Sequence, residues 1–371
     1  MKQTLTVKLV PDPEQHLSLL RTLEAFNDAC NWIAGIAFAR QCANKIDLQK
    51  LVYYDVRRRF GLSAQMTIRA ISKVVEAYKR DRAIRPTFRP HGAMTYDERV
   101  LSFPTVDRVS LLTLDGRVLV PIRFGGYFEA RRDRVRGQAD LLYRDGTFYL
   151  AVTVDSPEPV PDEADGFLGV DLGIVNLATD SDGTAYSGKD VERNRRIYAH
   201  RRRNLQRKGT HSARRKLRTL RGRQARYQRN VNHIISKAVV QKAKGTGRGV
   251  ALENLGGIRS RTTVKRKQRA RHANWTFSQL RSFIEYKARL AGVRVVAVDP
   301  RNSSRECARC GHIDKANRPN QATFSCVLCK HAALADHNAA RVLAARARAA
   351  VMRPMVPEAA GPSRQGQAQA L

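Results

Sequence analysis

The stretch that most constrains the fold of this chain is residues 167–180, Phe-Leu-Gly-Val-Asp-Leu-Gly-Ile-Val-Asn-Leu-Ala-Thr-Asp. It predicts a buried strand, a tight turn at Gly173 and a second strand that runs back. Apolar residues surround one carboxylate, Asp171. Burial of an ionised carboxylate is costly unless hydrogen bonds, a cation or a metal ion compensate it. Taken alone, the stretch is compatible with a simple turn aspartate or with a compensated functional carboxylate.

The segments that follow this hairpin predict a layer of alternating strands and helices. The expected strands are at 184–187, 249–253 and 293–298, and the expected helices are at 191–244, 274–291 and 336–350. Together with the hairpin they give the order of three strands, helix, strand, helix, strand, helix. That is the order of a ribonuclease-H-like α/β layer, with a cysteine-containing segment inserted before the last helix.

The first half of the chain has a different pattern. Residues 2–10 alternate as a strand does, and Asp12 followed by Pro13 marks the start of a helical region that continues to about residue 84. Short β-type runs come after that region, at 109–114, 118–124, 139–143 and 147–154. We therefore expect one small barrel, built from residues 2–10 and 95–155, with the helical segment inserted between its strands.

Four cysteines carry the most specific local signal. Cys307 and Cys310 form one CxxC pair, Cys326 and Cys329 form a second, and fifteen residues separate the pairs. This spacing is typical of a four-cysteine zinc ribbon, in which a structural Zn²⁺ supplies folding energy that so short a segment lacks. The remaining two cysteines, Cys30 and Cys42, do not have ligand spacing and are expected to be core thiols.

Two further carboxylates stand at the boundaries of expected elements. Glu253 ends a buried strand and is the only acidic residue between Glu192 and Glu285. Asp336 stands where the last helix begins. Each has a plain structural alternative: Glu253 could pair with a neighbouring arginine, and Asp336 could be the N-cap of its helix.

Asp171, Glu253 and Asp336 would converge at one edge of the expected sheet. Ala339 and Ala340 would let the last helix pack closely enough to bring Asp336 to that edge. Carboxylates so grouped repel one another unless cations fill the cluster, and oxygen ligands suit Mg²⁺ or Mn²⁺. Two such ions can activate a water molecule and stabilise the leaving oxygen in phosphodiester cleavage.

The charge of the chain indicates a polyanionic partner. The formal net charge is +35 and the pI is about 10.9, which favours nucleic acid. A basic membrane-binding protein is the rival, but the sequence has neither an apolar run of about 18 residues nor a signal-peptide pattern, so we expect an intracellular protein. The expected nucleic-acid-binding residues, which could otherwise form a solvated helix face, are Arg195, Arg196, Arg201, Arg202, Arg203, Arg207, Lys208, Arg214, Arg215, Lys216, Arg218 and Arg221.

Four ordered motifs resemble the TnpB (OrfB) family of IS200/IS605-type insertion sequences, which is related to the type V CRISPR (Cas12) effectors. The motifs are Gly169-Val170-Asp171-Leu172-Gly173-Ile174-Val175-Asn176-Leu177-Ala178-Thr179, Leu252-Glu253-Asn254-Leu255, Ser304-Arg305-Glu306-Cys307-Ala308-Arg309-Cys310-Gly311-His312 and Ala335-Asp336-His337-Asn338-Ala339-Ala340. The resemblance covers nearly the whole chain except the tail. Asn254 is a mild departure, since many members carry Asp there.

The resemblance implies an α+β multidomain protein. It implies a wedge-like β-barrel over 1–12 and 85–160, with a helical recognition insertion at 13–84. A RuvC-like nuclease domain would cover 164–300 and 335–350, and a zinc ribbon 301–334. The tail, 351–371, is expected to be disordered because it is rich in Pro, Gly, Gln and Ala.

The same resemblance implies an RNA-guided DNA endonuclease with one RuvC-like site. Asp171, Glu253 and Asp336 would be its catalytic carboxylates with two Mg²⁺ or Mn²⁺ ions, and the four cysteines would hold one Zn²⁺. Arg305 would support the scissile phosphate. The partners would be a guide RNA from the transposon end and double-stranded target DNA, with a monomer bound to RNA in the prokaryotic cytoplasm at the nucleoid. Two alternatives stay open: a protein-only transposase with an acidic triad, and a non-cleaving RNA-guided repressor.

Overall fold

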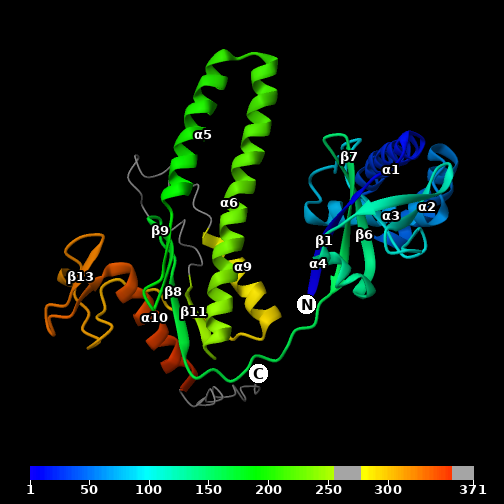
Figure 1. Ribbon diagram of the computed structural model, residues 1–371. Coiled ribbons are helices and arrows are strands. Elements are labelled where there is room, and N and C mark those ends of the chain that lie inside the picture. Colours follow the sequence, from blue (N-terminus) through cyan, green and yellow to red (C-terminus); the bar gives the residue numbers. More distant parts are fainter. Residues whose placement is uncertain (255–276, 353–371) are drawn as a thin grey trace, which may run out of the picture. The chain divides into compact units, whose positions relative to one another are not determined.

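The computed structural model describes residues 1–254 and 277–352. The chain forms two compact units, Met1–Pro157 and Glu158–Leu371 (Figure 1). The predicted tail lies outside the described residues except for its first two, which end the last helix. No helix in the described parts of the chain has the length and apolar character needed to cross a membrane.

A nearly closed, barrel-like sheet organises the first unit. Its order is β2-β6-β7-β1-β5-β4-β3, and every pairing in it is antiparallel. The strands at the two ends of this order are close in the chain, separated only by residues 97–100. The strands are β1 (Lys2–Leu9), β2 (Met94–Tyr96), β3 (Leu101–Ser102), β4 (Arg108–Thr113), β5 (Gly116–Arg123), β6 (Val135–Arg144) and β7 (Thr147–Asp155).

The turn between β6 and β7 shows how local chemistry sets the register of this sheet. Asp145 and Gly146 have φ values of 50° and 77°, so both central residues are left-handed. An Asp-Gly pair tolerates this conformation, and its twist matches that of the flanking strands. Arg144 pairs with Thr147, and the register continues from there along both strands. The β-type runs predicted at 139–143 and 147–154 are therefore confirmed, as the two strands of a hairpin.

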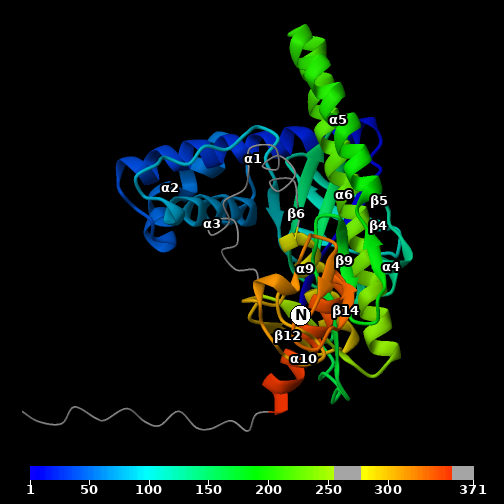
Figure 2. The ribbon, with the colours of Figure 1, turned by 90° about the vertical axis from the view of Figure 1, so that its left-hand side faces the viewer.

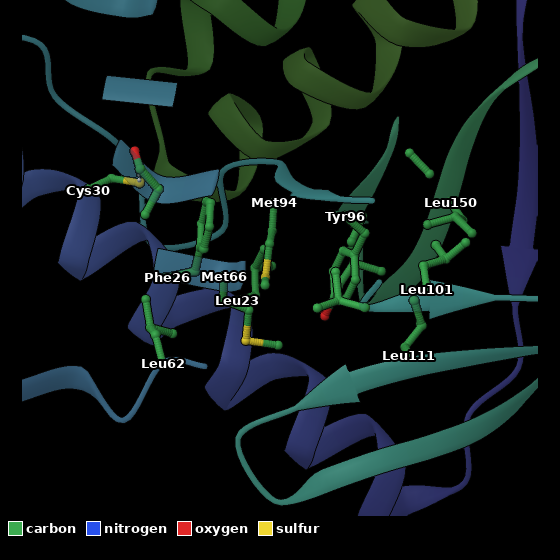
Figure 3. Packing of buried hydrophobic residues seen from close by; sticks show 14 of the residues in the cluster. Leu23, Phe26, Cys30, Leu62, Met66, Met94, Tyr96, Leu101, Leu111 and Leu150 are labelled. Atoms are coloured by element: carbon green, nitrogen blue, oxygen red, sulfur yellow. Dashed lines mark hydrogen bonds between the residues drawn. The ribbon is translucent and has the colours of Figure 1, made fainter. Parts of the chain in front are cut away.

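Three helices are inserted after β1, namely α1 (Pro13–Ala39), α2 (Lys45–Phe60) and α3 (Ala64–Arg80). Asp12 caps α1 through a hydrogen bond from the Gln15 backbone N–H, 2.8 Å long, as the Asp-Pro signal predicted. Figure 3 shows the buried side chains between the helices and strands, including Phe26 and Cys30 of α1 and Tyr96 of β2. Burial raises the pKa of the Cys30 thiol to about 12, so this cysteine is a core thiol as expected.

A five-stranded mixed sheet forms the centre of the second unit, with order β10-β9-β8-β11-β12. β8, β9 and β10 are antiparallel neighbours, whereas β11 and β12 run parallel to β8. The strands are β8 (Phe167–Asp171), β9 (Asn176–Asp180), β10 (Ala185–Ser187), β11 (Gly249–Glu253) and β12 (Val295–Val298). Each strand expected in this half of the chain is present, although β10 and β12 are short.

The basic stretch expected as one helical segment is a pair of helices, α5 (Lys189–Lys208) and α6 (His211–Gly245). The chain reverses at Gly209, whose φ is 65°, and Thr210 caps α6 by accepting a hydrogen bond from the Ala213 N–H. In Figures 1 and 2 this hairpin projects well beyond the sheet. Only the second half of α6 packs on the sheet, beside α9 (Phe277–Ala291).

The last helix, α10 (Ala335–Met352), covers the opposite face of the sheet from α6 and α9 (Figure 1). It approaches β8 so closely that a β-carbon on Gly169 would lie 1.9 Å from the Ala340 carbonyl oxygen. The expectation that Ala340 allows close packing is therefore confirmed. Gly169 on the strand is equally necessary, because any side chain there would collide with the helix backbone. The cysteine segment contains two short paired strands, β13 (Thr323–Ser325) and β14 (Ala332–Leu334), and β14 leads directly into α10.

Candidate metal and nucleic-acid sites

Two of the predicted carboxylates lie side by side at one edge of the sheet. Asp171 is the last residue of β8 and Glu253 is the last residue of β11. The two strands are parallel, and Val170 pairs with Leu252, so the register places the next residues of both strands beside each other. The carboxyl ends of these parallel strands therefore bring Asp171 and Glu253 together.

Asp336 reaches the same edge from α10. Asp336 is the second residue of the helix, which begins at Ala335. It therefore does not occupy the N-cap position, and the N-cap alternative is not what the structure shows. Its Oδ2 accepts a hydrogen bond of 3.0 Å from the Asn176 side-chain amide, at the start of β9. A strand residue thus fixes the orientation of this carboxylate.

The electrostatics of Asp171 show that the three groups act on one another. Burial, with the charges of Glu253 and Asp336, raises the pKa of Asp171 to about 8, and the guanidinium of Arg318 acts in the opposite direction. A carboxylate so perturbed, close to others of like charge, is typical of a functional site.

The Glu253 carboxylate is held by a hydroxyl rather than by an arginine. Burial raises its pKa, while a 2.7 Å hydrogen bond from the buried Ser303 hydroxyl and the charge of Arg346 lower it. The neighbouring Arg281 donates to the backbone carbonyl of Glu253 and pairs with Glu285. The alternative in which Glu253 simply neutralises an arginine is therefore not what the structure shows.

One polar atom beside these carboxylates has no partner. Thr179 is 4% exposed, its hydroxyl makes no hydrogen bond, and it pairs across the strands with Asp171. The site thus combines hard oxygen donors with an unsatisfied hydroxyl, which fits a hydrated Mg²⁺ or Mn²⁺ ion. Among the described residues, only the cysteine set has its ligand atoms all within 4.8 Å, so the carboxylates are spread more widely.

The four predicted zinc ligands form a tight cluster. The Sγ atoms of Cys307 and Cys329 are 3.6 Å apart, as are those of Cys310 and Cys326. A tetrahedral Zn²⁺ with Zn–S bonds of about 2.3 Å would separate its sulfur ligands by about 3.8 Å. The cluster therefore fits one four-coordinate ion.

The backbone around each CxxC pair is folded into a matching turn. The Cys307 N–H donates to the His312 carbonyl and the Gly311 N–H donates back to the Cys307 carbonyl, at 2.9 and 2.8 Å. Cys326 makes the equivalent pair of bonds with His331 and Lys330, at 2.9 and 3.0 Å. Both turns need a left-handed residue, which is Gly311 in the first and Lys330 in the second.

The cysteine segment is also tied to the carboxylate edge. The Asn338 side chain, two residues after Asp336, accepts from the Ala308 N–H at 3.0 Å and donates to the Glu306 carbonyl at 2.7 Å. Ser303, which holds Glu253, lies four residues before Cys307. The cysteine segment therefore helps to position two of the three carboxylates, Glu253 and Asp336.

Most of the predicted basic residues cover the projecting helical hairpin. All of them are exposed except Arg195, which forms a two-pronged ion pair with Glu192 at 2.7 and 2.8 Å. Arg195 is thus held by an ion pair within its own helix, and Arg196 shares the same glutamate. A cleft of about 840 Å³ opens between the two helices, lined in part by Leu217, Leu220, Tyr227, Arg202, Arg218 and Arg221.

Sequence reasoning selected Arg305 as the supporting cation and missed Arg318. The structure leaves the Arg305 side chain exposed, two residues before the first cysteine. Arg318, from the loop between the CxxC pairs, is the arginine whose charge lowers the pKa of Asp171. Asn176 and Ser303, which hold two carboxylates, were also missed, because only the folded register brings them to the site.

Some aromatic side chains of the first unit are buried in its core, and others lie on its surface, where they could stack on bases. Tyr78 is fully buried and Trp32 packs against Phe60, whereas Tyr54 on α2 is 78% exposed beside Tyr53. Core packing therefore accounts for the first two of these side chains.

Two family models and several known proteins match parts of this chain. Residues 149–250 match the OrfB_IS605 family, described as "Probable transposase", and residues 277–343 match the "Cas12f1-like, TNB domain" family. The chain is 31% identical over 219 residues to the CRISPR-associated endodeoxyribonuclease Cas12f1 of Sulfoacidibacillus thermotolerans, covering 54% of this chain and 50% of that protein. It is 24% identical over 385 residues to "Putative RNA-guided DNA endonuclease InsQ" of Escherichia coli (strain K12), covering 92% of each.

A solved structure supports the fold. The mini-RNA-guided endonuclease CRISPR-Cas_phi3 aligns with 96% of this chain and 93% of its own at a TM-score of 0.55 and 10% sequence identity. The chain spans about half the length of the Cas12f1 relatives that it matches. The resemblance recognised in the motifs is confirmed: the chain matches the OrfB_IS605 and Cas12f1-like TNB family models and is similar to proteins named InsQ and Cas12f1.

Proposed function

We propose that this protein is an RNA-guided DNA endonuclease that cuts target DNA next to a short motif by two-metal-ion hydrolysis. The observation that carries the proposal is the convergence of Asp171, Glu253 and Asp336 at one sheet edge, where burial and mutual repulsion raise the pKa of Asp171. The sheet order β10-β9-β8-β11-β12, with helices on both faces, supports assigning a RuvC-like domain to residues 164–300 and 335–350.

In this mechanism each residue at the edge has a distinct task. Asp171, Glu253 and Asp336 would hold two Mg²⁺ or Mn²⁺ ions, which when bound would activate a water molecule and stabilise the leaving oxygen. Ser303 and Asn176 orient Glu253 and Asp336 through the hydrogen bonds described above. Arg318, whose charge lowers the pKa of Asp171, would stabilise the scissile phosphate, and the exposed Arg305 of the same segment would support it.

The surface around the site is suited to hold nucleic acid. The exposed arginines and lysines of the α5–α6 hairpin would neutralise backbone phosphates. The cleft between its helices adds apolar side chains and Tyr227, on which unpaired bases could stack. The name of the relative InsQ supports a guide RNA and a DNA target. We propose that the RNA comes from the transposon end and that the DNA target is double-stranded.

The remaining parts of the chain complete this proposal. The barrel, residues 1–12 and 85–160, would act as the wedge-like support, and residues 13–84 as the recognition insertion. Residues 301–334 would form a zinc ribbon with one structural Zn²⁺, supported by the sulfur geometry. We propose that the protein acts as a monomer with its RNA in the prokaryotic cytoplasm, at the nucleoid.

Purification from cells carrying the native flanking DNA, followed by sequencing of bound RNA and a plasmid-cleavage assay in Mg²⁺, tests this function. We expect a discrete RNA and cutting of the matching target. Asp171→Ala should abolish cutting and keep the RNA, whereas Asp190→Ala, at an exposed residue on α5, should preserve both cutting and RNA binding. Strand joining without RNA would support the protein-only transposase instead, and cutting by Asp171→Ala at the wild-type rate would refute the active-site assignment.

A further inference from the structure

The buried hydroxyl of Thr179 is the polar atom at the carboxylate edge that the mechanism above does not use. The residue is 4% exposed and its Oγ1 has no hydrogen-bond partner. Buried hydroxyls in folded proteins are nearly always paired, so an unpaired one at a ligand site points to a group that is absent from the protein chain itself.

The strand register shows where this hydroxyl faces. Thr179 of β9 lies directly opposite Asp171 of β8, and opposed residues of antiparallel strands project from the same face. The next residue, Asp180, projects from the other face, where its carboxylate binds Lys242 at 2.6 Å. Thr179 therefore faces α10 and Asp336, together with Asp171.

We propose that Thr179 is a positioning residue of the ion site, whose hydroxyl holds a water molecule at the ion bound by Asp171. This inference rests on the proposed function, because it assigns a further residue to the same site. The hydroxyl has no hydrogen-bond partner among the described residues and almost no water-accessible surface, so neighbouring side chains would have to shift to admit the single water molecule that satisfies it. Partners beyond the ligands that act in this way commonly change metal affinity by about 10–100-fold when they are removed.

A purely structural role predicts something different. If the side chain only fills space, valine should replace it without loss, because valine has nearly the same shape and no polar atom. Removal of an unsatisfied hydroxyl should then leave the melting temperature of the metal-free protein unchanged or raise it. Metal affinity and metal-free stability therefore separate the two roles.

The test measures Mn²⁺ binding to the full-length, nucleic-acid-free protein by electron paramagnetic resonance, with Thr179→Val and Thr179→Ser. We expect Val to raise the Kd for Mn²⁺ about tenfold or more without lowering the melting temperature, and Ser to restore it to within about twofold of wild type. Thr6→Val, at an exposed site on β1, is the matched control and should bind Mn²⁺ as wild type does.

Each outcome decides a separate point. Wild-type Mn²⁺ affinity in Thr179→Val, or equal weakening by Val and Ser, would overturn the role of the hydroxyl while leaving the nuclease proposal intact. Asp171→Asn, measured in parallel, tests the site itself. Unchanged Mn²⁺ binding in that variant would show that the ion site is elsewhere, and both proposals would then fail together.

Discussion

A β-carbon added to Gly169 would stand 1.9 Å from the carbonyl oxygen of Ala340 and 2.7 Å from the amide nitrogen of Ala344. The strand that ends in Asp171 and the helix that begins before Asp336 are therefore in backbone contact. This contact, rather than any side-chain interaction, sets how closely the third carboxylate approaches the first.

We predict that Gly169→Ala destabilises the protein by about 1–3 kcal/mol or more and lowers DNA cleavage further than it lowers RNA binding, because α10 must move away. Chemical denaturation and cleavage assays at a temperature where the variant is folded would measure both effects. Gly166→Ala is the control, since a β-carbon there meets nothing within 4 Å. Equal cleavage by the two variants would contradict the role of the close contact.

Replacement of Arg318 by alanine should reduce the cleavage rate by roughly 10²–10³-fold with little change in zinc content, because a positive charge is removed from beside Asp171. Single-turnover cleavage at saturating Mg²⁺ is the appropriate measurement. Arg305→Ala provides the comparison, from an exposed position on the same segment. If Arg305→Ala proves the more damaging of the two, the sequence-based assignment of the supporting cation is the better one.

Substitution of Cys326 by serine should remove zinc and lower the melting temperature together. Elemental analysis should find one zinc per wild-type chain and none in the variant, since three sulfur ligands hold the ion far less well. Cleavage should fall as well, because Asn338 joins this segment to the helix of Asp336. Cys42→Ser, at a cysteine outside the cluster, should keep its zinc. A Cys326→Ser protein with full zinc would rule out this ligand set.

The exposed arginines of the helical hairpin should account for much of the salt dependence of RNA binding. Replacement of Arg201, Arg203, Arg214 and Arg215 by glutamine should reduce the slope of log K against log salt by about 0.7–0.9 for each phosphate that is no longer neutralised. Arg195→Gln should instead lower the melting temperature with a smaller change in slope, because it breaks the pair with Glu192. Identical slopes in the wild type and the fourfold variant would contradict this interface.

Lys287 predicts a pH dependence of stability. Burial, followed by the charge of Lys237, lowers the pKa of Lys287 to about 8 from 10.5, while its ammonium donates to the His233 carbonyl and the Ser236 hydroxyl. Between pH 8 and 10.5 the unfolded state therefore binds more protons than the folded state, so this group makes the protein more stable as pH rises. Urea denaturation at about pH 7.5 and about pH 9.5 should show that the free energy of unfolding of the wild type rises relative to that of Lys287→Met as pH increases. A difference that stays constant with pH would refute the shifted pKa.

Local sequence patterns were sufficient to predict much of the architecture. The Asp12-Pro13 start, the Asp145-Gly146 turn and the two CxxC pairs each predict a feature that depends on neighbouring residues, and the structure has the helix, the hairpin and the sulfur cluster there. The break between α5 and α6 at Gly209 and Thr210 was missed because the basic, helix-type sequence continues on both sides of it. β2 and β3 were missed because three and two residues carry no periodic signal.

The carboxylates of the site could be selected from the sequence, but the groups that hold them could not. Asp171 and Glu253 were recognisable because each ends an apolar strand. Ser303, Arg318 and Thr179 look like ordinary polar residues in the sequence, and their positions follow only from register and from the path of the cysteine segment. Contacts between residues that are distant in the sequence depend on tertiary packing, and a single sequence carries no local pattern that predicts them.

The placement of Asp336 on the last described helix has a consequence for synthesis of the protein. β8 and β11 are made early, but they lack the third carboxylate until the cysteine segment and α10 have also been translated and packed on the sheet. A nascent chain, or one truncated before α10, would carry the basic hairpin and still be unable to cut. If the proposed function holds, this chain order would delay DNA cleavage until α10 has packed on the sheet.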